Sequence, residues 1–509
     1  MLHEASTLTV WIVLPEGEPE PGPARLLHQL SADPRYEIAA LISAPRPENT
    51  MSGLLRAVLD LEKRLFPPRL RYPATPPGFP GGIVQQVSLA VVKARADTAD
   101  VIVDFTMNSN VVALASRARL GVWRLDAYSP AAGLEATMRR RPVVDVSLYR
   151  FDGAAQSGIA GAAYDAKKLA SHTQAYLREK SVQLIVAELA KLSQGRQLPD
   201  TPFDPPGFDL PDTAALRRYF VNSFAVGLTR LSARIQRKRG LTPNRFRLSV
   251  GAGDVLSFDP AGVFETTPRR NTFWADPFLV NQEGKTWCFF EEYDYATCQG
   301  QIAVGQLTDN GIEYVGSAMR TAYHMSFPYI FRHGEDMFMI PETVASGRIE
   351  VWRATDFPTG WTLHATAMEG QRAADTTLTL YNGDWWLFTN IGHDGFGDNC
   401  NELCIFRTSG PDLAWMEPHA LNPVVIGADR ARNAGRLFER GGKLYRMAQD
   451  NSGGIYGYGL KVMEISVLNL TDYSEQCIRH ITPEFREGVI GCHHFDTDGE
   501  RFVMDMLRP

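Results

Sequence analysis

The chain has 509 residues, of which 44% are hydrophobic and 22% charged, as in a globular rather than a disordered protein, and this length predicts two or three domains. Lys and Arg total 52 against 58 for Asp and Glu, and the net charge of −6 excludes a generally basic nucleic-acid-binding protein. No apolar run approaches the roughly 18 residues that span a bilayer. The six cysteines form no disulfide framework, and Cys400 and Cys404 lack the histidine spacing of a zinc site. We therefore expect free thiols in a reducing cytoplasm.

Residues 1–195 alternate apolar runs with helical patterns. The runs 8–15, 36–45 and 99–106 are predicted to be buried strands. The first of them lacks a basic leader and a small-residue cleavage site, so it is predicted to be a strand rather than a signal peptide. Residues 164–192 contain no Gly or Pro and predict a pair of helices. Strands that alternate with helices predict a Rossmann-like α/β domain with a mostly parallel sheet.

Within this region, the runs ADVIVDFT, LGVWRLDAYSP and RPVVDVSLYRFDG resemble the amino-terminal domain of formyltransferases that use formyl-tetrahydrofolate. In that family the strand after the LGV element carries an Asn and a His that polarise the formyl group and move protons. The matching positions 122–126 hold neither, so general acid–base assistance is missing. Asp152 matches the family's catalytic Asp, and a surface-turn role for it is equally open. The resemblance implies a retained fold with a lost or altered site.

Residues 196–244 connect this domain to the second half of the chain. Five prolines near the start of the segment predict an extended linker. A helix follows, capped by Asp212 or Thr213, with an apolar stripe and a basic face. Residues 213–253 hold nine cations and no Asp or Glu, so the remaining residues sum to −15. The basic face over residues 213–239 would suit an anionic membrane surface, and the alternative is a docking helix with solvated or paired cations.

Five copies of one unit fill residues 245–509, each an apolar strand, a Gly- or Asn-containing turn and an aromatic-rich strand with a polar end. The copies are residues 275–293, 327–343, 375–390, 434–450 and 493–506. Further strands lie between the copies, so the pattern predicts an all-β, five-bladed β-propeller. Because the last copy ends close to residue 509, residues 245–256 are expected to complete its blade.

The first strand of each blade lines the channel of a propeller, and its hairpin brings the start of that strand and the end of the next to one face. Polar and acidic residues collect there, and carboxylates are costly to desolvate together without partners. The candidate catalytic residues are Asp276, Asp375 and Glu342. The candidate substrate-binding residues are Glu292, Arg432, Arg436, Asp450, His493, Trp274 and Tyr329. The predicted ligand is a sugar, with no cofactor and with a divalent metal in the channel left open.

The propeller half resembles the five-bladed carbohydrate-active propellers of glycoside hydrolase family 43. The ADPF motif at 275–278 is similar to the family motif whose Asp is the general base, which implies that role for Asp276. The resemblance places a pKa-modulating Asp at Asp375 and a channel histidine at His493. It departs in the fourth blade, where ARNAGR at 431–436 replaces the family's general-acid Glu.

A closer resemblance covers nearly all of residues 271–506, with the runs FWADPF, FFEEY, SFPYIF, MIPET, DTTL, WWLFTN, AGRLF, YRMAQD and YGYGL. These runs look like the amino-terminal propeller of plant glucosamine inositolphosphorylceramide transferases. Bacterial proteins that join a formyltransferase-like domain to such a propeller look similar over the whole chain. In the plant proteins the transferase domain proper is a separate one. The resemblance implies glycan or glycolipid assembly without fixing the reaction.

Four functions follow from these patterns. The first is glycosyl transfer from a phosphorylated or nucleotide-linked sugar, with Asp276 as base, Asp375 stabilising developing positive charge, and Arg432 and Arg436 holding phosphate. The second is a family-43-like glycoside hydrolase with Glu342 as the acid. The third is a non-catalytic glycan-binding propeller, and the fourth is a sugar N-formyltransferase, which the missing Asn and His disfavour. The expected location is the cytoplasm, with peripheral membrane contact through residues 213–239 and no nucleic-acid partner.

Overall fold

The computed structural model describes residues 7–47, 51–68, 87–93, 96–153, 155–199, 201–204, 208–221, 245–309 and 311–509. The chain divides into two compact units, residues 1–226 with 393–397, and residues 227–392 with 398–509. Among the described residues, no helix is both long enough and apolar enough to cross a membrane. All six cysteines are free.

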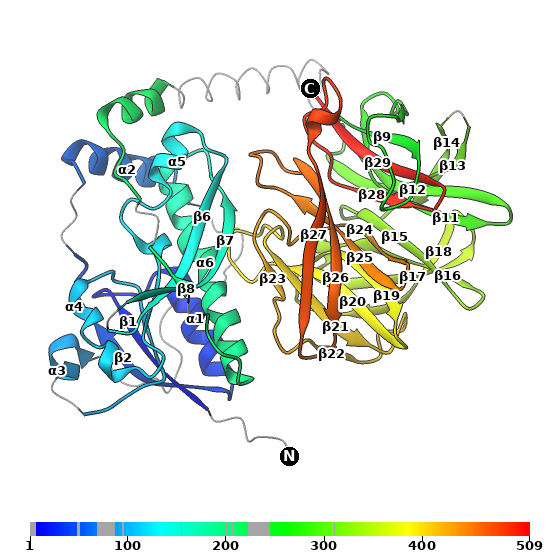
Figure 1. Ribbon diagram of the computed structural model, residues 1–509. Helices are drawn as coiled ribbons and strands as arrows, with labels where there is room; N and C mark the ends of the chain where they lie inside the picture. Colours follow the sequence, from blue (N-terminus) through cyan, green and yellow to red (C-terminus); the bar gives the residue numbers. More distant parts are fainter. Residues whose placement is uncertain are drawn as a thin grey trace. The chain divides into compact units, whose positions relative to one another are not determined.

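The first unit is built on an eight-stranded sheet in the order β3-β2-β1-β4-β5-β6-β7-β8 (Figure 1). The first five strands in this order are parallel, and the pairings from β5 to β8 are antiparallel. The strands are β1 Leu8–Leu14, β2 Tyr36–Ser43, β3 Val87–Ser88, β4 Val101–Asp104, β5 Val122–Leu125, β6 Val143–Phe151, β7 Gln156–Asp165 and β8 Thr201–Pro202. The central strand β1 is buried along most of its length, which explains its continuous apolar sequence.

The helices of this unit are α1 Pro21–Ala32, α2 Gly53–Leu65, α3 Leu89–Lys93, α4 Ser109–Val112, α5 Leu134–Arg139 and α6 Ala170–Ser193. The predicted helical stretch over residues 164–192 is helical from Ala170 onward, but it forms the single helix α6 rather than a pair. Its start is wrong, because Tyr164 belongs to β7, where it pairs with Val144 of β6. Helix α6 packs on α1, whose buried Arg25 donates hydrogen bonds to Glu179 and Gln183.

The described part of the connector bears out its predicted cap. Residues 213–221 are helical, and Asp212 accepts a hydrogen bond from the Ala215 backbone N–H at 2.6 Å. Leu216 and Tyr219 from the predicted apolar stripe are buried with residues of α2. The remainder of the predicted basic helix, with most of its cations, lies outside the described residues.

The second unit is the predicted five-bladed β-propeller, and each of the five repeat copies supplies the inner hairpin of one blade (Figure 1). Blade one holds β11 Thr272–Gln282, β12 Lys285–Asp294, β13 Gln299–Thr308 and β14 Gly311–Met319. Blade two holds β15 Ser326–His333, β16 Asp336–Glu342, β17 Ile349–Asp356 and β18 Gly360–Ala367. Blade three holds β19 Ala373–Tyr381, β20 Asp384–Ile391, β21 Glu402–Thr408, β22 Met416–Pro418 and the extra strand β23 Val425–Ile426. Blade four holds β24 Asn433–Arg440, β25 Lys443–Asp450, β26 Gly459–Leu468 and β27 Tyr473–Ile481.

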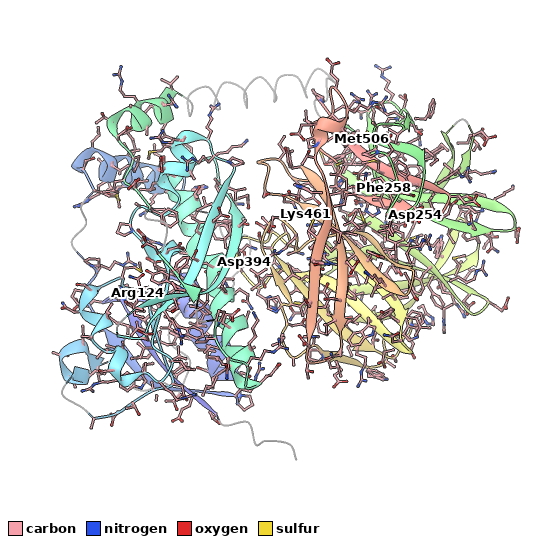
Figure 2. All side chains as sticks on the ribbon, in the orientation of Figure 1. Arg124, Asp254, Phe258, Asp394, Lys461 and Met506 are labelled. Carbon is pink, nitrogen blue, oxygen red and sulfur yellow. The ribbon has the colours of Figure 1, made fainter. Side chains whose placement is uncertain are left out.

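Blade five is shared between the two ends of the propeller, as predicted. It contains β28 Phe495–Thr497, β29 Arg501–Arg508, β9 Arg245–Ala252 and β10 Phe264–Glu265, in the order β10-β9-β29-β28. Strands β9 and β29 pair antiparallel over eight residues. Phe258 and Met506, labelled in Figure 2, belong to the buried cluster that packs this blade against blade four, and the Phe258 and Phe495 rings lie 4.2 Å apart. Pairing and packing together close the ring.

Candidate functional site

The innermost strand of four blades carries a bulge near its start. Strand pairing shifts between Ala275 and Phe278, Ser326 and Tyr329, Ala374 and Thr377, and Asn433 and Leu437. Each bulge holds a residue at positive φ: Asp276 at 53°, Phe327 at 45°, Asp375 at 47° and Gly435 at 143°. A bulge re-aims a side chain, and the left-handed conformation costs a non-glycine residue about 1–3 kcal/mol. Such strain is typical of functional sites. The bulges place two of these strained residues, Asp276 and Asp375, at equivalent points of two blades.

Arg432 joins carboxylates from two other blades. Its Nε lies 2.6 Å from Asp375 Oδ2, and its Nη2 donates to Asp375 Oδ1 at 3.2 Å and to Glu342 Oε2 at 3.0 Å. Gln449 Nε2 adds a hydrogen bond to Asp375 Oδ2 at 3.3 Å. The Arg432 guanidinium also lies 5.4 Å from the ring centroid of Tyr456, whose side chain is 46% exposed. Candidate site residues that belong to three different blades thus form one connected cluster.

Asp276 lies in a second part of the cluster, beside the two histidines of blade five. Its Oδ2 accepts a hydrogen bond from the Phe327 backbone N–H at 3.2 Å, and its Oδ1 lies 3.4 Å from His493 Nε2. His493 Nδ1 lies 2.8 Å from Asp505 Oδ2, and Asp505 Oδ1 accepts hydrogen bonds from the backbone N–H groups of His493 and His494. The backbone and the imidazolium together fix the orientation of the Asp276 carboxyl group.

Burial sets the protonation of both aspartates. It raises the pKa of Asp276 to about 7, with His493 opposing the shift and Asp375 adding to it. Burial likewise raises the pKa of Asp375 to about 7; Arg432 opposes this shift, and the charge of Glu342 and a hydrogen bond with it add to it. A carboxyl group with a pKa near 7 can either give or accept a proton at neutral pH.

The histidines respond to the same surroundings in opposite directions. Burial lowers the pKa of His493, but the charges of Asp505, Asp276 and Asp375 and a hydrogen bond with Asp505 together raise it to about 9, so the ring is an imidazolium at neutral pH. Burial lowers the pKa of His494 to about 3, so that ring is neutral. Neither ring nitrogen of His494 has a hydrogen-bond partner in the described part of the chain.

Asp276, His493 and Asp505 are also close enough to offer one ligand atom each to a cation. Binding a divalent metal there would require His493 to lose the proton that Asp505 stabilises. We assign no chemical step to a metal.

The predicted residues Glu292 and Trp274 do not join the cluster. They pair across β11 and β12 on the side of the blade that faces away from it, where Trp274 Nε1 donates to Glu292 at 3.3 Å. Glu292 also accepts from Gln301 at 2.8 Å, and the Trp274 ring stacks on Tyr314. The pair is a packed polar layer of the blade.

Arg436, Tyr329 and Asp450 likewise have other partners. Arg436 donates two hydrogen bonds to Asp496, at 2.5 and 2.7 Å, and one to the Leu279 carbonyl. The hydroxyl of buried Tyr329 donates to the Leu378 carbonyl. Asp450 lies 2.8 Å from His480 Nε2 and accepts a hydrogen bond from the Ser452 backbone N–H. These contacts tie blades and loops together.

Glu291 is the channel residue of an adjacent acidic pair: the sequence places both Glu291 and Glu292 at this face, but the candidate set names only Glu292. Burial raises the pKa of Glu291 well above its usual range, and the charges of Asp276 and Glu342 add to the shift. The sequence holds a signal for this residue. Counting back from the two-residue turn at 283–284, where Gln282 pairs with Lys285, places Glu291 opposite Asp276 in an unbulged hairpin.

In the first unit, the strand compared with formyltransferases carries an ion pair. Arg124, labelled in Figure 2, lies 2.6 Å from Asp104, and both side chains are buried. Asp152 is exposed and accepts a hydrogen bond from the Ala155 backbone N–H at 2.9 Å, as a turn residue does.

The known proteins with similar sequences match the propeller part of this chain. Residues 261–494 match the family model described as glucosamine inositolphosphorylceramide transferase 1, N-terminal. The chain is 35% identical over 266 residues to glucosamine inositolphosphorylceramide transferase 1 of Arabidopsis thaliana and 36% identical over 224 residues to that of Oryza sativa subsp. japonica. These stretches are 50% and 43% of this chain but only 34% and 29% of the relatives, so the chain spans about a third of their length.

Solved glycoside hydrolases are similar in fold at low identity. A family 117 glycoside hydrolase of Zobellia galactanivorans gives a TM-score of 0.34 at 11% identity, over 52% of this chain and 91% of the hydrolase. A GH43_1 enzyme of Xanthomonas citri, complexed with xylose, gives 0.33 at 14%, over 47% and 89%. Identities this low concern the fold alone. The similarity that extends to sequence is thus the one over residues 261–494, to the N-terminal part of glucosamine inositolphosphorylceramide transferase 1.

Proposed function

We propose that the propeller is a carbohydrate-active enzyme that makes or breaks a glycosidic bond at its channel mouth. One observation carries the proposal: Asp276 and Asp375 occupy matching strained bulges of two blades, are buried, and each have a pKa raised to about 7. A pair of carboxyl groups is the machinery that glycosidic chemistry requires, one to protonate the leaving oxygen and one to activate the nucleophile.

In this proposal Asp276 is the base. The Phe327 N–H and the His493 imidazolium hold its carboxylate, which takes the proton of an attacking hydroxyl. The hydrogen-bonded pair of Asp375 and Glu342 gives its proton to the departing oxygen as the new bond to the anomeric carbon forms and the old one breaks. Arg432 keeps that pair in place and stabilises it once the proton has left.

The attacking hydroxyl distinguishes transfer from hydrolysis. We propose transfer to a hydroxyl of a glycan or glycolipid, because the curated relatives are named as transferases that act on an inositolphosphorylceramide. Water in the same place would give a hydrolase.

The sequence also predicted that a phosphorylated or nucleotide-linked sugar binds at this mouth. Such a ligand requires arginines that are not already paired with carboxylates. Arg436 is engaged by Asp496, and Arg432 is shared between two carboxylates. Asp276, Glu291 and Asp505 add further acidic groups nearby. We therefore propose that the sugar bound at the mouth is neutral or positively charged, since a phosphate would meet an excess of carboxylates.

The test uses the full chain with a panel of aryl glycosides of neutral sugars and amino sugars, with and without sugar acceptors. Aryl release and the mass of the products report turnover and transfer. Asp276→Asn and Asp375→Asn should each lower turnover about 100-fold or more, because Asn tolerates the left-handed conformation but cannot exchange the proton. Glu292→Gln, which changes a buried acid that faces away from the cluster, should leave turnover unchanged. Sugar binding without turnover in the unmodified protein would replace the proposal with a glycan-binding role.

A further inference from the structure

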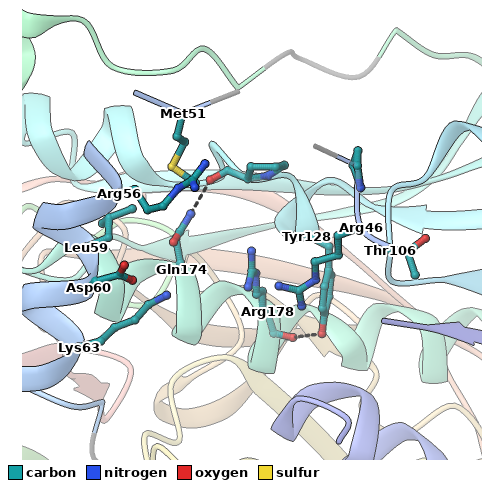
Figure 3. A pocket seen from close by; sticks show the side chains of 12 residues that line it. Arg46, Met51, Arg56, Leu59, Asp60, Lys63, Thr106, Tyr128, Gln174 and Arg178 are labelled. Atoms are coloured by element: carbon teal, nitrogen blue, oxygen red, sulfur yellow. Dashed lines mark hydrogen bonds between the residues drawn. The ribbon is translucent and has the colours of Figure 1, made fainter. Parts of the chain in front are cut away.

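A cavity of about 270 Å³ in the first unit is lined by more cations than acids (Figure 3). Its cationic side chains are Arg46, Arg56, Lys63 and Arg178, and Asp60 is the one carboxylate among its lining residues. None of these residues belongs to the propeller. Grouped like charges repel one another, so their convergence needs a counter-charge.

The elements of the unit bring the cations together by their spacing. Arg56, Leu59, Asp60 and Lys63 follow one another at i, i+3, i+4 and i+7 along α2 and therefore share one face of that helix. Gln174 and Arg178 are one turn apart on α6, and Arg46 comes after the end of β2. Figure 3 shows the labelled side chains of both helices converging on one space.

The cavity lies at the carboxyl edge of the parallel strands. Thr106 follows the end of β4, Tyr128 comes after the end of β5, and both line it. In open α/β sheets this edge is where ligands bind, because the chain leaves the strands there in loops that form a crevice. The position therefore agrees with a ligand site independently of its charge.

Arg178 supplies a donor that the protein leaves unused. Its Nη1 donates to Glu20 at 3.1 Å, and Glu20 also pairs with Arg46. The Nε of Arg178 is buried and has no hydrogen-bond partner among the described residues. A buried donor without a partner is costly, and a bound acceptor would remove that cost.

We propose that this cavity binds a phosphorylated small molecule, with a phosphoryl group held by Arg178, Lys63 and Arg56. Among the described lining residues together with Glu20, four cations face two carboxylates, so positive charge is in excess, as the binding of a phosphoryl dianion requires. Arg178 Nε donates to a phosphoryl oxygen, and the neighbouring guanidinium and ammonium groups complete the shell. The volume holds a phosphosugar or the diphosphate part of a nucleotide.

Titration calorimetry on the full chain with pyrophosphate, glucose 1-phosphate and UDP tests the proposal. At least one of them should bind, and Lys63→Gln should weaken its binding about tenfold because one charge-assisted hydrogen bond is lost. Arg178→Gln should weaken it further. The matched control is Arg64→Gln, the next residue on α2, which does not line the cavity and removes the same charge. It should change the dissociation constant less than about twofold.

The comparison of probes identifies the ligand. Equal binding of pyrophosphate and UDP means recognition of phosphoryl groups alone, whereas tighter binding of UDP or glucose 1-phosphate means that the organic part contacts the cavity as well; both support the site. Absence of binding by all three probes at millimolar concentration overturns it. Equal weakening by Lys63→Gln and Arg64→Gln also overturns it, since the attraction would then be diffuse. Because Asp276→Asn leaves this cavity intact, failure of the propeller proposal would not alter the result.

Discussion

The channel mouth of the propeller and the cavity of the α/β unit are opposite in charge and in construction. The mouth gathers buried carboxylates on strand bulges and holds one arginine among them. The cavity gathers cations on the faces of two helices, where Arg56 and Lys63 are exposed to solvent. A charge buried on a strained backbone is costly to desolvate and shifts its pKa, whereas a charge on an exposed helix face stays solvated.

This difference separates chemistry from binding. Proton transfer at neutral pH needs groups whose pKa has been moved towards 7, and burial at the mouth supplies that shift. Capture of a phosphate needs only permanent positive charge, which Arg and Lys carry without help. We therefore expect substitutions at the mouth to change stability and pH dependence, and substitutions at the cavity to change affinity alone.

The largest effect is expected where the bulge geometry itself is broken. Gly435→Ala should lower the free energy of unfolding by about 4 kcal/mol or more, because the added Cβ would lie 2.1 Å from the Phe495 carbonyl oxygen. Gly383→Ala, also at positive φ but with open space around its Cβ, should cost only about 1 kcal/mol. Urea unfolding followed by tryptophan fluorescence measures both free energies of unfolding. Equal losses of stability in the two variants would contradict a steric requirement for glycine at position 435.

A smaller effect on stability is expected from the charge of Asp276. Its raised pKa means that the folded protein holds the proton more tightly, so the contribution of this group to stability is greatest at low pH and is lost as pH rises through about 7. Asp276→Asn removes that loss. The difference in free energy of unfolding between the variant and the unmodified protein should therefore be about 2 kcal/mol more favourable to the variant at about pH 8 than at about pH 5.5. Denaturant titrations at the two pH values measure the gain, and an equal effect at both would contradict a buried, shifted carboxyl group.

The turnover of the propeller should have a maximum near neutral pH. Below about pH 7 the base Asp276 takes up a proton, and above it the pair of Asp375 and Glu342 loses the proton that it must donate. Each limb should fall about tenfold per pH unit. Initial rates from about pH 5 to pH 9 test this, with Glu292→Gln as the control that keeps the profile. A flat profile over this range would contradict the proposal that Asp276 and Asp375, whose pKa burial raises, transfer the protons of the reaction.

The smallest effect is expected at the cationic cavity. Lys63→Gln should change the free energy of unfolding by no more than about 0.5 kcal/mol, because its side chain is exposed on α2. Thermal unfolding of the variant beside Arg64→Gln measures this. A large loss of stability in the Lys63 variant alone would mean that the residue holds the unit together, and the contrast between the two sites would then fail.

Much of the fold could be predicted from the sequence because it repeats. Five copies of one hairpin indicated the number of blades, and the short last copy indicated that residues 245–256 close the ring. Helix and strand were harder to separate near Tyr164, where the absence of Gly and Pro is compatible with both and pairing with β6 decides.

The candidate site was predicted in part. The errors arose where the sequence did not show which of two adjacent strand residues faces the channel. Asp276, Asp375, Glu342, Arg432 and His493 come together as the blade geometry indicates. Glu292 and Asp450 fall one residue away from Glu291 and Gln449, which face the cluster. Along a strand, neighbouring side chains point to opposite faces, so an error of one residue reverses the assignment. At two of the bulges another blade binds the backbone: the Asp276 N–H donates to Asp505, and the Asp375 carbonyl accepts from Asn433. No local pattern reports such contacts.

The pairing of β9 with β29 has a consequence for how the protein is made. The two strands are separated by about 250 residues, and their hydrogen bonds can form only when both have left the ribosome. Blades one to four can assemble during synthesis, but β9 stays without its partner until residues 501–508 appear. Completion of the mouth, to which His493 and Asp505 of the last blade contribute, therefore waits until β29 has paired with β9.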